Sequence, residues 1–91
     1  MDVEEAIKWV LSVDRRMLVM RDAHQNGIIR VSELANQSGR SVQNISRAIH
    51  ELEEQGIMEC ITPEKTSWKR YVLTPLGKRV YERMREQQVF D

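Results

Sequence analysis

Residues 31–56, VSELANQSGRSVQNISRAIHELEEQG, are the part of this chain that decides its expected fold. The stretch predicts two short helices joined by a tight turn. The hydroxyl of Ser32 can cap the first helix by accepting a hydrogen bond from a backbone N–H group. Gly39 can adopt the positive φ that the turn needs. Ser41 is expected to cap the second helix and Gly56 to end it.

The second helix of this stretch has an apolar side and a polar side. Hydrophobic residues recur at steps of three and four, which predicts a face buried in the core. These residues are Val42, Ile45, Ile49 and Leu52. The opposite side carries amide and guanidinium groups, which can form hydrogen bonds with the edges of adenine and guanine in a major groove. The predicted base-contacting residues are Gln43, Asn44, Arg47 and His50.

The order of small and apolar residues in this stretch resembles a known DNA-binding motif. Ala35 would let the two helices cross closely, Gly39 would form the corner, and Ile45 would fill the space between the helices. Ser46 and Arg47 follow directly. This ordered set resembles the helix-turn-helix. The hairpin expected after it resembles the winged version found in MarR-like and ArsR-like regulators of bacteria and archaea.

This resemblance covers roughly residues 13–80 and implies a regulator of transcription, more often a repressor, that binds double-stranded DNA. The helix at 41–55 would enter the major groove and the hairpin at 57–73 would be a wing on the DNA backbone. Helix N-termini direct N–H groups at anions, so residues near them are candidates for phosphate contact. The candidates for backbone contact are Ser32, Arg40, Ser41 and Ser46, and those on the wing are Lys65, Thr66, Lys69 and Arg70.

The remaining segments predict a small mixed fold around this motif. Helical periodicity predicts a helix over 2–11 and a second from about Asp14 to His24, with Met17, Leu18 and Met20 buried. A short strand at 28–31 and a hairpin with strands at 57–62 and 69–73 would form a three-stranded antiparallel sheet. Thr74 and Pro75 suit the start of a last helix that continues to about residue 88. The expected fold is therefore α+β, mostly helical, in a single winged-helix domain over residues 1–91.

The terminal helices are the expected dimer contacts, because the resemblance implies a homodimer built from them. The segments concerned are 2–11 and 75–90. Their apolar and aromatic residues selected for this role are Val3, Ile7, Trp9, Val80, Met84 and Phe90. The second tryptophan, Trp68, could stack on a sugar, pack the wing against the body of the protein, or lie in a protein interface. Packing of the wing is the favoured interpretation.

Composition sets limits on class and compartment. Lys and Arg number 14 and Asp and Glu number 14, so net charge gives no argument for binding nucleic acid. The distribution of charge along the chain does favour such binding, because residues 65–85 hold seven basic residues and only Glu82 as an acidic one. The one cysteine, Cys60, excludes an internal disulfide and fits a reducing compartment. With no signal peptide evident at its start, a cytoplasmic protein is expected.

Enzymatic interpretations find little support. The sequence has no nucleophile elbow, phosphate loop or pair of catalytic carboxylates, and His24, His50 and Cys60 are isolated from one another, which predicts no metal and no cofactor. Cys60 is expected to be a small buried residue rather than a redox switch. The alternative function is a protein-binding winged-helix adaptor that does not contact DNA. Zero net charge and the acidic residues within 51–64 favour it, and the sequence identifies no small-molecule effector.

Overall fold

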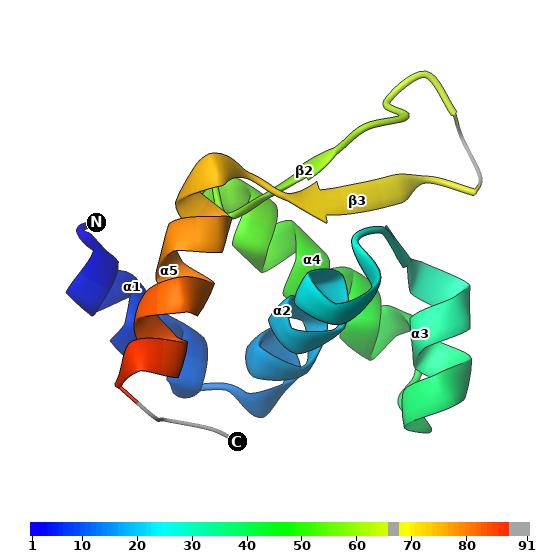
Figure 1. Ribbon diagram of the computed structural model, residues 1–91. Coiled ribbons are helices and arrows are strands. Elements are labelled where there is room, and N and C mark those ends of the chain that lie inside the picture. Colours follow the sequence, from blue (N-terminus) through cyan, green and yellow to red (C-terminus); the bar gives the residue numbers. More distant parts are fainter. Residues whose placement is uncertain (66–67, 88–91) are drawn as a thin grey trace.

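The computed structural model describes residues 1–65 and 68–87, and every structural statement below refers to these residues. The chain forms five helices and a small sheet, as the sequence predicts (Figure 1). The elements in chain order are α1 (Val3–Leu11), α2 (Asp14–Asn26), β1 (Ile29–Arg30), α3 (Val31–Ser38), α4 (Val42–Glu54), β2 (Met58–Cys60), β3 (Arg70–Leu73) and α5 (Pro75–Glu86).

The predicted three-stranded antiparallel sheet is confirmed, with β3 in the middle of the order β1-β3-β2. Ile29 of β1 lies opposite Tyr71, and Met58 of β2 lies opposite Leu73. The described residues of the hairpin formed by β2 and β3 extend beyond the helices as the wing (Figure 1). Thr66, one of the predicted wing contacts, lies outside the described residues.

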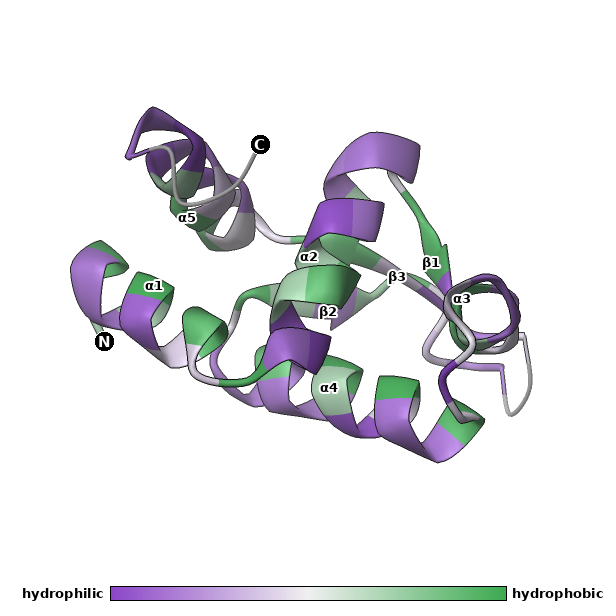
Figure 2. Ribbon diagram, turned by 90° about the horizontal axis from the view of Figure 1, so that it is seen from below, coloured by the Kyte–Doolittle hydropathy of each residue, from purple (hydrophilic) through white to green (hydrophobic). Residues whose placement is uncertain are grey.

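The hydrophobic core is formed by buried side chains from all five helices and from the sheet. Along α4 the hydrophobic residues alternate with hydrophilic ones, as an amphipathic helix requires (Figure 2). The α2 prediction needs a correction. Met20 is buried as expected, but its buried neighbours are Val19 and Ala23, whereas Met17 and Leu18 are only half-buried. The helix is turned so that the 19–20–23 side faces the core.

The first helix of the motif starts earlier than predicted. α3 begins at Val31, and Arg30 occupies the N-cap position without a side-chain cap. Ser32 is therefore not the cap: it lies in the first turn and is exposed. The corner is as predicted, since Gly39 ends α3 in the left-handed region with φ of 73°.

The second helix of the motif, α4, begins at its predicted cap. The Ser41 hydroxyl accepts a hydrogen bond from the backbone N–H of Asn44 at 3.0 Å. The buried side consists of Ile45, Ala48, Ile49 and Leu52. The prediction was wrong for Val42, which is 53% exposed because it stands in the first turn, beyond the helices that cover the rest of that side.

The start of α5 is hydrogen-bonded to the residues that follow α4. The Thr74 hydroxyl accepts from the N–H of Gly77 at 3.0 Å and donates to the carbonyl of Gly56 at 2.6 Å. The backbone N–H of Thr74 donates to the carbonyl of Ile57 at 3.0 Å. A Cβ at position 77 would collide with that same carbonyl, so only glycine permits this close approach.

The terminal helices α1 and α5 pack against each other, at the end of the molecule away from the wing (Figure 1). This contact corrects part of the predicted dimer surface. Ile7, Val80 and Met84 are at most 4% exposed and belong to the core of the single chain. Val3 and Trp9 are half-buried, and Phe90 lies outside the described residues.

Candidate nucleic-acid interface

The solvent-facing side of α4 presents three of the predicted base-contacting residues. Gln43, Arg47 and His50 are exposed, whereas Asn44 is half-buried. Their direction follows from the other side of the same helix, where Ile45 and its neighbours are fixed in the core. The polar side chains therefore project from a rigid support, which is what reading a base edge requires.

Val42 joins these residues on the exposed side of α4 and was missed from the sequence, because its spacing fits the buried stripe. An exposed aliphatic side chain in the first turn of such a helix can contact the methyl group of thymine. Its exposure next to Gln43 and Ser46 is the only indication of this role, and a pattern of three- and four-residue steps could not supply it.

Arg47 has no carboxylate partner among the described residues. Its side chain is exposed, so it can form hydrogen bonds with a ligand without first breaking an ion pair. A free guanidinium on a helix with no acidic residue in its first turn is suited to guanine or phosphate.

Arg40, predicted to contact phosphate, forms hydrogen bonds with two residues of the chain itself. Its Nη2 donates to Oδ2 of Asp14 at 2.7 Å, and its Nη1 donates to Oδ1 of Asn44 at 3.3 Å. The hydrogen bond and the charge of Arg40 lower the pKa of Asp14. Arg40 and Asn44 therefore connect the start of α4 to the start of α2, and a phosphate would have to compete with Asp14.

A second set of ion pairs connects the far half of α4 to α2. Glu51 accepts from Arg15 Nη2 at 2.8 Å and from Arg16 Nε at 3.2 Å. The hydrogen bond from Arg15 is the main cause that lowers the pKa of Glu51. We call the paired residues between the two helices the α2–α4 seam. Its members are Asp14, Arg15, Arg16, Arg40 and Glu51.

The seam also reaches α1 through Trp9. The guanidinium of Arg16 lies 3.9 Å from the centroid of the Trp9 ring and donates to the Trp9 carbonyl at 2.8 Å. One face of this indole is thus covered within the chain by a cation–π contact. This explains an aromatic residue off the apolar stripe of α1 without requiring a second protein copy.

The base of the wing carries basic side chains that face solvent. Lys65, Lys69 and Arg70 are exposed, and none forms an ion pair within residues 1–65 and 68–87. The backbone N–H of Arg70 donates to the Thr62 hydroxyl at 3.0 Å, and its carbonyl accepts from the N–H of Ile61 at 2.9 Å. The backbone of the hairpin is thus paired beyond the strands, while the cations stay available.

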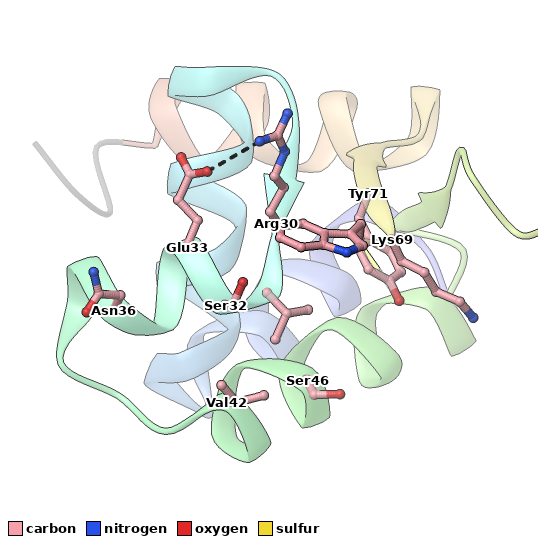
Figure 3. Close-up of a pocket in the computed structure, with 10 residues that line it drawn as sticks. Arg30, Ser32, Glu33, Asn36, Val42, Ser46, Lys69 and Tyr71 are labelled. Atoms are coloured by element: carbon pink, nitrogen blue, oxygen red, sulfur yellow. Dashed lines mark ion pairs between the residues drawn. The ribbon is translucent and has the colours of Figure 1, made fainter. Parts of the chain in front are cut away.

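A groove of about 770 Å³ separates the wing from the motif (Figure 3). We call it the wing groove; it is lined by Arg30, Val31, Ser32, Glu33, Asn36, Val42, Ser46, Trp68, Lys69 and Tyr71. Arg30 and Glu33 form an ion pair at 3.8 Å on its α3 side. Trp68 is 79% exposed, so the prediction that it packs the wing against the body was wrong.

Other kinds of site are not apparent in the part of the chain that the structure describes. No three residues among the His, Cys, Asp and Glu described there are grouped so that they could hold a metal ion. Cys60 is half-buried, lies opposite Tyr71 in the sheet and packs against the core. None of the described helices has the length and apolar character to cross a membrane.

Comparisons with known proteins agree with this geometry. The family model described as the MarR family matches residues 14–61, from the start of α2 to the residue after β2. A search of curated proteins finds no match. A crystal structure of the MarR family transcription regulator SP03579 is similar with a TM-score of 0.76 and 23% identity, over 94% of this chain and 58% of that one.

Two further structures are similar at lower identity. NadR in complex with 4-hydroxyphenylacetate gives a TM-score of 0.71 at 21% identity, over 93% of this chain and 64% of that one. The PcaV regulator from Streptomyces coelicolor gives 0.68 at 19% identity, over 86% and 60%. At these identities the likeness shows the fold. The chain spans about 58% of the length of the first of these proteins.

Proposed function

The chain belongs to the MarR family, and from this premise we propose that it is a transcriptional regulator that binds double-stranded DNA through α4 and the wing. In this proposal α4 enters the major groove, where Gln43, Arg47 and His50 meet base edges and Val42 meets a thymine methyl group. The single observation that carries the proposal is the exposed, unpaired polar side of a helix whose other side is fully buried.

The basic residues of the wing support contact with the backbone. Lys65, Lys69 and Arg70 are free of carboxylates in the described chain and stand on a hairpin beside the α4 surface. Phosphate contacts of this kind fix orientation and supply affinity without reading sequence. Thr66 remains a candidate for the same role.

A homodimer would place two α4 helices on neighbouring half-sites about 34 Å apart, one turn of DNA. The terminal helices α1 and α5 lie at the end away from the wing, so pairing there leaves both DNA contacts free. Leu11, 42% exposed at the end of α1, is available to this surface. Val3, Trp9 and Phe90 remain candidates, whereas the three core residues named above do not.

Repression is the form of regulation that requires the fewest binding surfaces on the protein. Occupying a promoter requires only the DNA contacts, whereas activation needs a second surface that recruits polymerase. We propose repression on this ground. A reporter under a promoter that carries the selected site should lose expression when the protein is present.

The experiment that tests DNA binding is a titration of labelled random duplex, followed by selection and sequencing of bound duplexes. Binding should weaken steeply between about 50 and 200 mM salt, as counterion release requires. The selected sequences should contain two related half-sites. If no duplex is retained at low salt and micromolar protein, the proposal fails and the result supports the alternative of a protein-binding adaptor.

A further inference from the structure

The wing groove lies between the two surfaces that the proposed function places on DNA. α4, on one wall, is the helix assigned to the major groove, and the wing, on the other wall, is assigned to the backbone. A DNA strand that passes from one to the other must cross this groove. For the strand that crosses there, we propose that the exposed indole of Trp68 packs against a deoxyribose ring.

Trp68 is placed to make an apolar contact with something outside the chain. It is 79% exposed, and its φ of 62° lies in the left-handed region that bulky residues rarely adopt. Val42, also 53% exposed, lines the same groove from α4. Two large apolar side chains left open on facing walls indicate a surface that becomes covered on binding.

The charges of the groove fit a strand that alternates apolar sugars with anionic phosphates. Lys69 has no ion pair in the described chain, and the pair that Arg30 makes with Glu33 is long and solvent-exposed. Exposed pairs of this kind contribute little and are easily exchanged. Among the described residues, Glu33 is the one carboxylate that lines the groove. Its charge repels the strand, so Glu33→Gln should tighten binding to every duplex.

The contact proposed for Trp68 differs from that of the lysine beside it. A sugar face is uncharged and the same in every nucleotide, so Trp68 should strengthen binding to all sequences without changing the number of counterions released. Lys69 meets a phosphate, and its loss should reduce the slope of log affinity against log salt by about 0.9. This inference depends on the proposed function but makes its own predictions.

Fluorescence can test the contact directly, because the chain has only two tryptophans. In the Trp9→Phe variant, Trp68 is the one indole left. Addition of the selected duplex should shift its emission to shorter wavelength and protect it from acrylamide. The matched Trp68→Phe variant reports on Trp9, which Arg16 covers, and should change little. Unchanged emission and quenching of Trp68 at saturating duplex would overturn the proposal.

Measurements of affinity for duplex DNA give a second test of the Trp68 contact. Trp68→Ala should weaken binding by about tenfold, in line with the cost of removing an aromatic contact to a nucleotide. Its salt slope and its selected sequence should match those of the parent protein, and Trp68→Phe should recover part of the loss. If the parent protein binds duplex and Trp68→Ala binds equally well, only the contact assigned to Trp68 fails. If the parent protein binds no duplex, the proposed function fails as well.

Discussion

Arginine side chains lie on both sides of α4 and have opposite roles. On the side facing α2, Arg15 and Arg16 are both committed to Glu51, and Arg40 is committed to Asp14. On the side facing solvent, Arg47 has no such partner in the described chain. The same guanidinium group therefore stabilises the helix pair in one place and remains available to a ligand in the other.

This difference shows how to separate supporting residues from contacting residues in a small domain. Overall charge does not do so, because the chain holds equal numbers of basic and acidic residues. What separates them is whether each cation already has a carboxylate within reach. The following substitutions, ordered by expected effect, test that separation.

The largest effect is expected from Ile45→Ala, which removes a fully buried side chain from the inner side of α4. A cavity left by such a change costs about 2–5 kcal/mol of unfolding free energy. Chemical denaturation with circular dichroism measures it. Val42→Ala, on the same helix but exposed, is the matched control and should change stability by less than about 0.5 kcal/mol. Equal losses for the two variants would show that α4 is not oriented as described.

Arg47→Ala tests the outer side and should leave stability within about 0.5 kcal/mol of the parent. DNA affinity should fall by about 1–3 kcal/mol, and preference at one base position should relax, because a contact to a base edge is lost. Fluorescence anisotropy with the selected duplex and with single-base variants of it measures both. An equal loss of affinity for all of these duplexes would show that Arg47 contacts a phosphate and not a base edge.

Glu51→Gln tests the seam and should cost about 1 kcal/mol of unfolding free energy, since a charged acceptor of two arginines becomes neutral while staying partly exposed. The lowered pKa of Glu51 makes this contribution depend on pH. The contribution is fully present above the unfolded value near 4.5 and is lost as the pH falls through the lower folded value.

Denaturation at a series of acidic pH values separates Glu51 from the other carboxylates. The parent protein should lose stability below a pH of about 4.5, and the variant should lose less over the same range. Asp14 and Glu4 also have lowered pKa values and keep part of the dependence in both proteins. Parallel curves for the two proteins would mean that ionisation of Glu51 contributes no stability over this pH range.

The smallest effect is expected from Lys69→Ala on the wing. One phosphate contact fewer should weaken all duplexes about equally and reduce the salt slope by about 0.9. Titration of the selected and the random duplex at several salt concentrations measures this. The matched variant Lys8→Ala, on an exposed position of α1, should leave the slope unchanged.

Sequence patterns predicted the helices, the β2–β3 hairpin and the Gly39 corner well, because these depend on local spacing. They failed where distant segments meet. Arg40 was assigned to phosphate because it stands beside a helix N-terminus, and its pairing with Asp14, 26 residues away in the chain, could not be seen from local patterns. Ile7 and Val80 were assigned to a dimer because nothing local shows that α1 and α5 cover each other.

The candidate site shows the same division between local and distant information. The polar side of α4 follows from helical periodicity, so Gln43 and Arg47 could be identified in advance. The wing groove could not, since Val42 and Trp68 come together only when the hairpin folds beside α4. Periodicity placed Val42 in the core because it does not show where a neighbouring helix stops covering the surface.

The tight contact between Gly77 and the Ile57 carbonyl has a mechanical consequence for DNA recognition. It joins α5 to the end of α4 through backbone atoms, so little bending is available between the two helices. If α5 lies in a dimer interface, this rigid connection fixes the distance between the two α4 helices of the dimer. One base pair inserted between the half-sites rotates one of them by about 35°. The dimer should therefore fail to bind DNA with that spacing between the half-sites.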